Sequence, residues 1–472
     1  MAELLGKLVP LPLTARSFQN RVRTIGSPVL SNGVAEMAGE GRSRAPSFPI
    51  TPREGLLPFS RPDAPGAFRG GFEFDSSTMY AAVGEKLFRV DGEGVSRLVG
   101  ALPGSAPVRF ARNRRTSPQI VAVTGGQAHV IEGGNISPLP VPSPGVGFIS
   151  PIDVDFLLGY VLFITRSGTM HFTGIDDVSS LSSLNFLTAE INTDGLLRVL
   201  TRKLEAWLFG ERSIEVWVAT GDLERPFQRL QGAYIERGIA APQSLVKVRD
   251  RAVWVADDLD VVMVGDGYSP ESISSTSIVR EIEGLGKAVA SLEGCTYSIG
   301  GHDKYVLSCG SWTRVYDFHT REWSDFKTDG MARWRAGKAV QFGTRYVLGD
   351  VDAPDLYVVS EKAYRDGDRP IVLSTVLPAL TSHPAALSFF DFHLAIECGP
   401  TPGVARIRWT DDGGRNWSPW RSRPMVNDGR SVRFGGLGQS GRNGRQFEIA
   451  FEAAEGRSLV GGTAHVGQVS YP

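Results

Sequence analysis

Short apolar segments and tight polar turns alternate through the middle of the chain. Each unit has an apolar segment rich in Val, Ile, Phe, Tyr and Trp, a turn of Gly, Asp or Ser, and a second apolar segment. This pattern is typical of a β-hairpin. Seven units recur at intervals of 40 to 52 residues, and they begin at Ala81, Val121, Leu162, Trp207, Val253, Tyr305 and Tyr346.

A hairpin of this size cannot bury its own apolar face, so the units must pack on one another. Repeats of about 40–50 residues with one hairpin each are typical of β-propeller blades. The sequence therefore predicts an all-β protein in which residues 46–380 form a six- or seven-bladed β-propeller. An array of β-sandwiches is the structural alternative.

The turn residues support this interpretation, because glycine adopts positive φ without steric cost, as primed hairpin turns require. The glycines in these turns are Gly84, Gly125, Gly126 and Gly168. In the unit that begins at Val253, we expect Asp257 and Asp258 to take the place of glycine, although less readily.

Toward the end of the chain, alternating apolar and polar residues replace the repeat. In the segment 389–398, we expect one buried face that consists of Phe390, Phe392, Leu394, Ile396 and Cys398. The segment 406–422 predicts a hairpin, and the segment 447–452 predicts a further strand. Together these segments predict a C-terminal β-sandwich-like domain over residues 381–472.

Residues 1–45 lack the repeat and are polar. They include five arginines, which are Arg16, Arg21, Arg23, Arg42 and Arg44. We expect an extended N-terminal arm that becomes ordered on a partner. The alternative is a strand that closes the propeller ring, together with a loose end.

The distribution of charge narrows the classes of function. The chain has 472 residues and a net charge of -1, so the molecule as a whole offers no reason to bind nucleic acid by counterion release. Residues 151–300 contain 21 acids and 13 bases, whereas residues 401–450 contain nine arginines and four acids. This asymmetry suggests faces for different partners, with ordinary solvated faces as the alternative.

The cysteines and the lengths of the apolar runs indicate the compartment in which the protein folds. Cys295, Cys309 and Cys398 form no CxxC pair, and scattered thiols in odd number argue for a reducing compartment during folding. The chain begins with an acid at Glu3 and no continuous apolar region, so we expect no signal peptide. No apolar run approaches the length of a membrane span, and we expect no membrane insertion.

The segment TDDGGRNW fits the Asp-box pattern through Thr410, Asp412, Gly414 and Trp417. We expect a structural turn, because Asp412 can accept backbone N–H groups, Gly414 permits the bend and Trp417 can pack under the hairpin. Sialidases carry several such boxes on propellers, so a propeller glycosidase is an alternative. A single box outside the repeat region favours the structural interpretation.

No other motif predicts a catalytic, cofactor or metal site. The seven histidines form no metal-ligand spacing. Gly436, Gly438 and Gly441 have GxGxxG spacing, but a predicted strand follows them instead of a helix, which favours a glycine loop. We therefore expect neither enzymatic activity nor a cofactor.

Several segments together resemble a known family. GLLRVLTRKLEAWLFGERSIEVWVATG, followed by YIERGIAAPQSLVKVRDRAVWVADD, resembles the packaged-DNA stabilisation proteins, which are tail accessory factors or tail hub proteins of short-tailed Salmonella-type bacteriophages. RAPSFPITPREGLLPF, FLTAEINTDGLLRV and LGQSGRNGRQFEIAF are similar to further landmarks of the family in the same order. The resemblance extends from about residue 8 to residue 470, although RTIGSPVL near the start is more apolar than the corresponding segment of the family.

The resemblance implies a structural role without catalysis. Six copies would form a homohexameric ring below the portal–adaptor complex, extend the DNA channel as a nozzle and retain packaged DNA. The ring would also seat a tail needle or plug and tailspikes or tail fibres, and it would contact passing genomic DNA transiently during genome ejection. We expect the protein in the virion tail, and in the host cytoplasm during assembly.

We expect two charged regions of the chain to have specific contacts in the tail that the resemblance implies. Arg16, Arg21 and Arg23 are candidate contacts between the N-terminal arm and the adaptor. The acidic stretch 151–300 suits a channel wall, because acids repel the phosphates of passing DNA. The alternative function is that of a propeller glycosidase or an adhesin that binds bacterial surface polysaccharide.

Overall fold

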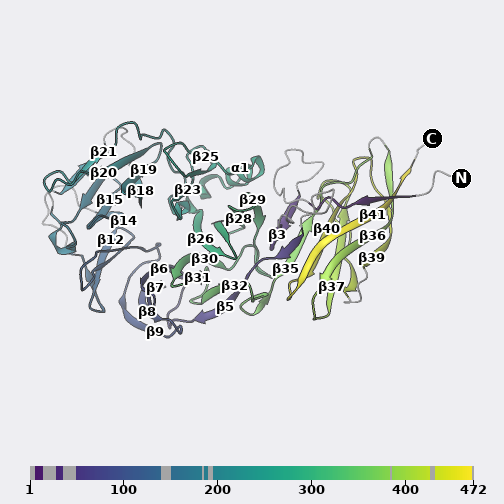
Figure 1. The fold of residues 1–472 in the computed structure, drawn as a ribbon, viewed down its shortest axis with the longest axis horizontal. Helices are drawn as coiled ribbons and strands as arrows, with labels where there is room; N and C mark the ends of the chain where they lie inside the picture. Colours follow the sequence, from purple (N-terminus) through teal and green to yellow (C-terminus); the bar gives the residue numbers. More distant parts are fainter. Residues whose placement is uncertain are drawn as a thin grey trace.

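The computed structural model describes residues 6–13, 28–35, 49–139, 150–182, 185–189, 195–382, 385–425 and 431–469. Figure 1 shows a ring of small sheets beside an elongated body of longer strands. The ring is a β-propeller and the elongated body is a β-sandwich, which confirms the predicted fold class.

The first four blades of the propeller follow one another along the chain as antiparallel sheets. Blade one contains β6 (Phe68–Asp75), β7 (Thr78–Val83), β8 (Lys86–Asp91) and β9 (Ser96–Ala101). Blade two contains β10 (Arg109–Arg112), β11 (Ile120–Thr124), β12 (Gln127–Glu132) and β13 (Asn135–Pro138). Blade three contains β14 (Pro151–Leu157), β15 (Tyr160–Thr165), β16 (Thr169–Phe172) and β17 (Phe186–Thr188). Blade four contains β18 (Leu196–Arg202), β19 (Glu205–Gly210), β20 (Ile214–Ala219) and β21 (Phe227–Arg229).

Three further blades complete the ring. Blade five contains β22 (Val246–Val248), β23 (Arg251–Val255), β24 (Val261–Val264) and β25 (Glu271–Ser272). Blade six contains β26 (Glu293–Ile299), β27 (His302–Ser308), β28 (Thr313–Asp317) and β29 (Glu322–Asp325). Blade seven contains β30 (Ala336–Phe342), β31 (Arg345–Asp350), β32 (Leu356–Ser360) and β5 (Gly55–Ser60), and its sheet continues into β33 (Arg365–Asp366) and β34 (Arg369–Pro370). The connections include α1 (Thr276–Glu283) and the 3-10 helices η1 (Val178–Ser180), η2 (Pro242–Ser244) and η3 (Gly286–Ser291).

Each predicted hairpin is the second and third strand of one blade, which resolves the expected count of six or seven in favour of seven. The four turn glycines adopt positive φ, as expected. The expectation for Asp257 and Asp258 was wrong, because Leu259 takes the positive φ of 67°. A hydrogen bond from Leu259 N to Ala256 O, 2.9 Å long, closes the turn and places the left-handed residue there. The Leu259 side chain packs on the core between blades five and six.

Blade seven closes the ring with a strand from the beginning of the chain. β5 pairs antiparallel with β32, with Leu57 opposite Val358. The closing strand lies inside the predicted propeller range of 46–380 and not within residues 1–45. A propeller closed in this way leaves only short, protected sheet edges.

The sandwich consists of two sheets around one apolar core. One sheet has the order β3-β4-β41-β36-β39 with β1 paired to β41, and its strands are β1 (Lys7–Pro10), β3 (Gly33–Ala35), β4 (Ile50–Pro52), β36 (Ala386–Cys398), β39 (Val432–Gln439) and β41 (Arg457–Val469). The other has the order β2-β35-β40-β37-β38, and its strands are β2 (Val29–Ser31), β35 (Val372–Val376), β37 (Gly403–Thr410), β38 (Arg421–Met425) and β40 (Gln446–Glu452). Phe392 of the first sheet meets Phe447 of the second, with ring centroids 4.6 Å apart.

Both ends of the chain contribute to this sandwich. The sequence pattern predicts an arm over residues 1–45 and a C-terminal domain that begins at residue 381. Within that first range, β1, β2 and β3 are strands of the sandwich, because apolar residues such as Leu30 and Ala35 are buried in its core. Arg16, Arg21 and Arg23 lie outside the described residues, so their contact with an adaptor stays a prediction.

The predicted buried face of β36 is interrupted at its beginning. Phe390 is 37% exposed, whereas Phe389 is 2% exposed, so the expectation for Phe390 was wrong. The register of β36 shifts between Phe389 and Asp391 against both neighbouring strands. This irregularity reverses the alternation of faces, and beyond it Phe392, Leu394 and the following apolar residues are buried as expected.

One continuous sheet joins the propeller to the sandwich. β2 pairs with β29 of blade six on one side and with β35 of the sandwich on the other, which gives the nine-stranded order β26-β27-β28-β29-β2-β35-β40-β37-β38. The junction between β2 and β29 is short: Ser31 is paired with Asp325, and the Ser31 hydroxyl donates to the Asp325 carboxylate at 3.0 Å.

Two buried charged residues precede the closing strand. The Arg53 guanidinium donates to both carboxylate oxygens of Asp366 at 3.0 and 2.7 Å, and its Nε donates to Asn32 Oδ1 at 2.9 Å. The neighbouring Glu54 accepts from Lys304 Nζ at 2.9 and 2.7 Å. Burial opposes the ionisation of Glu54, but the charge and hydrogen bonds of Lys304, together with the hydrogen bond from Tyr297, hold the pKa of that carboxyl below its usual value. The two residues thus connect the closing strand to blade six, to blade seven and to the sandwich.

We predict that Arg53→Met destabilises the protein by about 3–5 kcal/mol, because Asp366 would remain buried without its partner. The matched control is Arg61→Met, which breaks an ion pair with Asp355 in which the arginine side chain is 70% exposed. For that control we expect a loss of about 0–1 kcal/mol. Urea unfolding of both variants measures the difference, and equal midpoints would contradict the role of Arg53.

Candidate functional site

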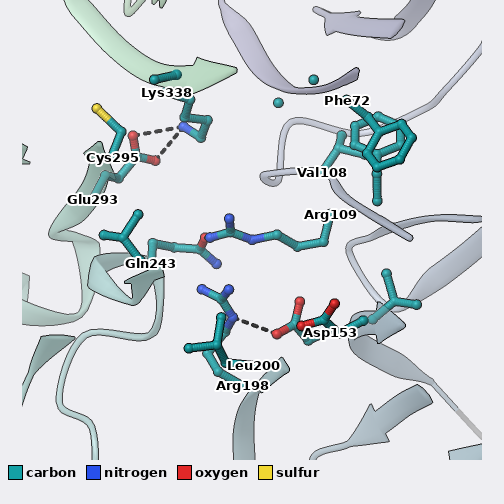
Figure 2. Close-up of a pocket in the computed structure, with 18 of the residues that line it drawn as sticks. Phe72, Val108, Arg109, Asp153, Arg198, Leu200, Gln243, Glu293, Cys295 and Lys338 are labelled. Atoms are coloured by element: carbon teal, nitrogen blue, oxygen red, sulfur yellow. Dashed lines mark hydrogen bonds and ion pairs between the residues drawn. The ribbon is translucent and has the colours of Figure 1, made fainter. Parts of the chain in front are cut away.

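The innermost strands of the blades surround a polar pocket at the centre of the ring (Figure 2). The pocket has a volume of about 260 Å³. Alternate residues of a strand point to the same side, so residues such as Asp153 and Asp155 of β14 both line it. The charged residues of its wall are Arg109, Asp153, Asp155, Arg198, Glu293 and Lys338. We call this space the axial pocket.

Two ion pairs in the axial pocket connect neighbouring blades. Arg198 Nε of blade four lies 2.6 Å from Asp153 Oδ2 of blade three, and the same carboxylate oxygen accepts from Val199 N at 3.0 Å. Lys338 Nζ of blade seven donates to both carboxylate oxygens of Glu293 of blade six at 2.8 Å. Figure 2 shows these pairs on opposite sides of the pocket.

Arg109 differs from the other cations because it has no ion-pair partner among the described residues. Its side chain extends from β10 across the pocket to Gln243, to whose side-chain oxygen Nη2 donates (Figure 2). Its Nε is buried and has no hydrogen-bond partner in the described part of the chain. Burial, and then the nearby Arg198, lowers the pKa of Arg109 to about 10, so the guanidinium is still charged at neutral pH.

Asp155 is the anion without an ion pair that faces the same space. Its carboxylate accepts from the backbone N–H groups of Phe156 at 2.8 Å and Thr201 at 2.6 Å. Burial outweighs these hydrogen bonds and raises the pKa of Asp155 to about 6. The pocket therefore presents a guanidinium and a carboxylate, neither of which is neutralised by an ion pair within the described residues.

The Asp-box residues lie in the sandwich, away from the axial pocket, between β37 and β38. Asp412 Oδ1 accepts from Thr410 Oγ1 at 2.8 Å and from the backbone N–H groups of Arg415 and Asn416 at 3.0 Å each. The backbone and side-chain hydrogen bonds from Asn416 contribute most to lowering the pKa of Asp412 to about 2. Gly414 has φ of 92°, which glycine adopts without strain.

The turn also positions an aromatic stack. The Arg408 guanidinium lies 4.6 Å from the ring centroid of Trp417 and 4.5 Å from that of Trp420. Arg408 in turn donates to Glu448 at 2.5 Å. In this structure the four predicted Asp-box residues thus form a turn whose contacts hold a hairpin together.

Residues 54–364 match the protein family described as "Bacteriophage P22 Gp10, beta-propeller". The chain belongs to this family. This confirms the resemblance seen in the sequence, and the P22 Gp10 match spans all seven blades together with the closing strand β5. The sandwich strands from β35 to β41 lie beyond the matched range.

Two solved structures are similar to this chain at low sequence identity. "Streptogramin B lyase structure" is 8% identical with a TM-score of 0.46, and the match covers 65% of this chain and 98% of that chain. "Crystal structure of WD40 beta propeller domain of Doa1" is 10% identical with a TM-score of 0.43, and the match covers 66% and 99%. A comparison with curated proteins finds no match.

Metal-ligand groups and membrane-spanning helices are both absent from the described residues of this P22 Gp10 family member. No group of three or more His, Cys, Asp or Glu side chains there could hold a metal ion. No helix in the same residues is long and apolar enough to cross a membrane. All three cysteines are buried, and none of them forms a disulfide with another described residue.

Sequence reasoning missed the axial pocket. The available signal was charge at alternate positions in the segment before a predicted hairpin, as at Asp153 and Asp155 before the unit at Leu162. A charged residue in such a segment is as compatible with a solvated strand face as with a ring axis. The convergence of strands that are far apart in the sequence, such as β6 and β30, becomes visible only in the closed ring.

We predict that Asp412→Ala loosens the turn without opening the propeller, because Asp412 accepts the hydrogen bonds that fix it. Amide hydrogen exchange at Arg415 and Asn416 should become faster, while exchange in β7 and β23 stays unchanged. The matched control is Asp222→Ala, which removes a similar hydrogen bond, 2.8 Å long, from Glu224 N to Asp222 Oδ1. Unchanged exchange at both amides in Asp412→Ala would refute the structural role of the box.

Proposed function

We propose that this chain is a structural protein of a short-tailed bacteriophage tail. In this proposal it assembles as a six-membered ring below the portal–adaptor complex, extends the DNA channel as a nozzle and retains packaged DNA. It also seats the tail needle or plug and the tailspikes or fibres. The observation that carries the proposal is the match of the entire ring to the P22 Gp10 family.

The mechanical design supports this role. A component that retains packaged DNA must keep its shape under load. Here an apolar core cluster fills the interface between each blade and the next around the closed ring, and the sandwich extends from blade six by a continuous sheet. A six-membered ring requires head-to-tail contacts that close by rotation, and a rigid subunit maintains the angle that such closure needs.

The acidic residues of blades four and five suit a surface that faces DNA. Residues 151–300 contain 21 acids and 13 bases, and exposed acids such as Glu224 and Asp257 contribute to this excess, while the same blades also expose bases such as Arg225, Arg229 and Arg251. A surface of this sign repels phosphates and lets DNA pass, whereas a basic surface would bind and delay it. We place this surface toward the channel.

The decisive test uses phage particles assembled without this chain. We expect heads that package DNA and then lose it, so that the genome becomes accessible to nuclease, and we expect a plasmid copy of the gene to restore retention. In complemented particles, a label on the chain should appear in the tail below the portal. Stable DNA retention without the chain would contradict the proposal, and cleavage of host polysaccharide by the purified chain would favour a propeller glycosidase.

We predict that the triple substitution Arg16→Gln, Arg21→Gln and Arg23→Gln weakens attachment to particles that carry the adaptor. These changes leave strands β1 and β2 intact, so the sandwich should fold normally. The matched control replaces three exposed arginines of the ring, Arg61, Arg97 and Arg225, with Gln. Co-sedimentation with tailless particles measures attachment, and equal attachment of both triple variants would exclude the arm arginines as the adaptor contact.

A further inference from the structure

We propose that the axial pocket binds a small zwitterion that carries one carboxylate and one ammonium group, as in an amino acid or a short peptide. This site does not depend on the proposed tail function. It is argued from the charges, the unpartnered polar atoms and the size of the pocket.

The charges of the wall favour a ligand of both signs. Three cations and three carboxylates line the pocket, so its formal net charge is zero. Two ion pairs account for four of these groups, which leaves Arg109 and Asp155. A ligand with a single charge would leave one buried charge uncompensated, and this is costly in a partly desolvated space. A zwitterion can neutralise both remaining groups at once.

Two buried polar atoms without a hydrogen-bond partner among the described residues also favour a ligand that carries both an acceptor and a donor. Arg109 Nε is a buried donor and Asp153 Oδ1 is a buried acceptor, and neither has a hydrogen-bond partner among the described residues. The Asp153 side chain lines the pocket and is only 1% exposed, so its free oxygen has no access to bulk solvent. Buried polar atoms of this kind are rarely left unsatisfied. A ligand that supplies one acceptor and one donor satisfies both atoms.

The arrangement of the side chains indicates how the ligand lies. Figure 2 shows the Arg109 guanidinium in the middle of the pocket next to Gln243, with Arg198 below it and Asp153 to one side. A carboxylate between Arg109 and Arg198 relieves the repulsion between the two guanidinium groups and accepts charge-assisted hydrogen bonds. The ammonium group then lies toward the carboxylates of Asp153 and Asp155.

The size of the pocket limits the ligand. About 260 Å³ is below the usual range for a drug-sized ligand, which indicates a single amino acid or a dipeptide. A second cavity of about 310 Å³ shares Glu293 and Lys338 with the axial pocket. It is also lined by Ser105 and Arg333, which precede the innermost strands of blades two and seven. The two cavities therefore adjoin at the Glu293–Lys338 ion pair.

The test begins with the purified full chain and the twenty standard L-amino acids, screened individually by thermal shift. The best amino acid is then compared by calorimetry with its analogue without the amino group and its analogue without the carboxylate. We expect the zwitterion to bind about tenfold or more tightly than either analogue, because each loses a charge-assisted contact. Absence of binding by all twenty amino acids and by the dipeptide Gly-Gly, or equally tight binding of the analogue without the amino group, would overturn the proposal.

Variants locate the site. Arg109→Gln should weaken binding of that amino acid by about tenfold or more, and Asp155→Asn should weaken it through the ammonium group. The matched control is Arg112→Gln on the same strand, whose guanidinium lies over the Phe74 ring instead of in the pocket. Arg109 has no ion pair to lose, so its variant should fold, with unchanged circular dichroism as the check. If Arg109→Gln and Asp155→Asn both bind the amino acid as tightly as the wild-type chain does, the ligand does not lie between these two residues.

Discussion

The burial of two consecutive charged residues, Arg53 and Glu54, is the constraint on which the closed ring depends. The Arg53 guanidinium lies 4.9 and 5.1 Å from the ring centroids of Phe326 and Trp334, so it has no access to water and must keep its carboxylate partner. Separating either buried charge from its partner is strongly unfavourable. These pairings therefore fix the path of the chain into β5, and the strand that follows is directed onto β32.

The same segment also unites the two parts of the molecule. Asn32, directly after β2, accepts from Arg53 and donates to the carbonyl groups of Lys327 and Val372, which lie on the propeller and sandwich sides of the junction. Ring closure and sandwich docking therefore share one buried hydrogen-bond network. The ring and the sandwich are thereby linked through shared buried contacts and not only through the short pairing of β2 with β29.

Local pattern was sufficient to predict the hairpins and hence the propeller, since each blade repeats the same apolar segments and turns. It failed where the outcome depends on distant contacts. The irregularity beside Phe390 is set by two neighbouring strands, and the turn at Leu259 by a hydrogen bond and core packing. The pairing of Arg53 with Asp366, and the convergence of Arg109 on the ring axis, join residues that no local pattern connects.

Native-state hydrogen exchange in increasing urea shows whether the closing strand, the ring and the sandwich form one cooperative unit. We expect the amides paired between β5 and β32, and those paired between β2 and β35, to become exchangeable together with the inner strands of the ring. Exchange of β5 at much lower urea, with the remaining blades still protected, would show that the ring does not depend on this closure.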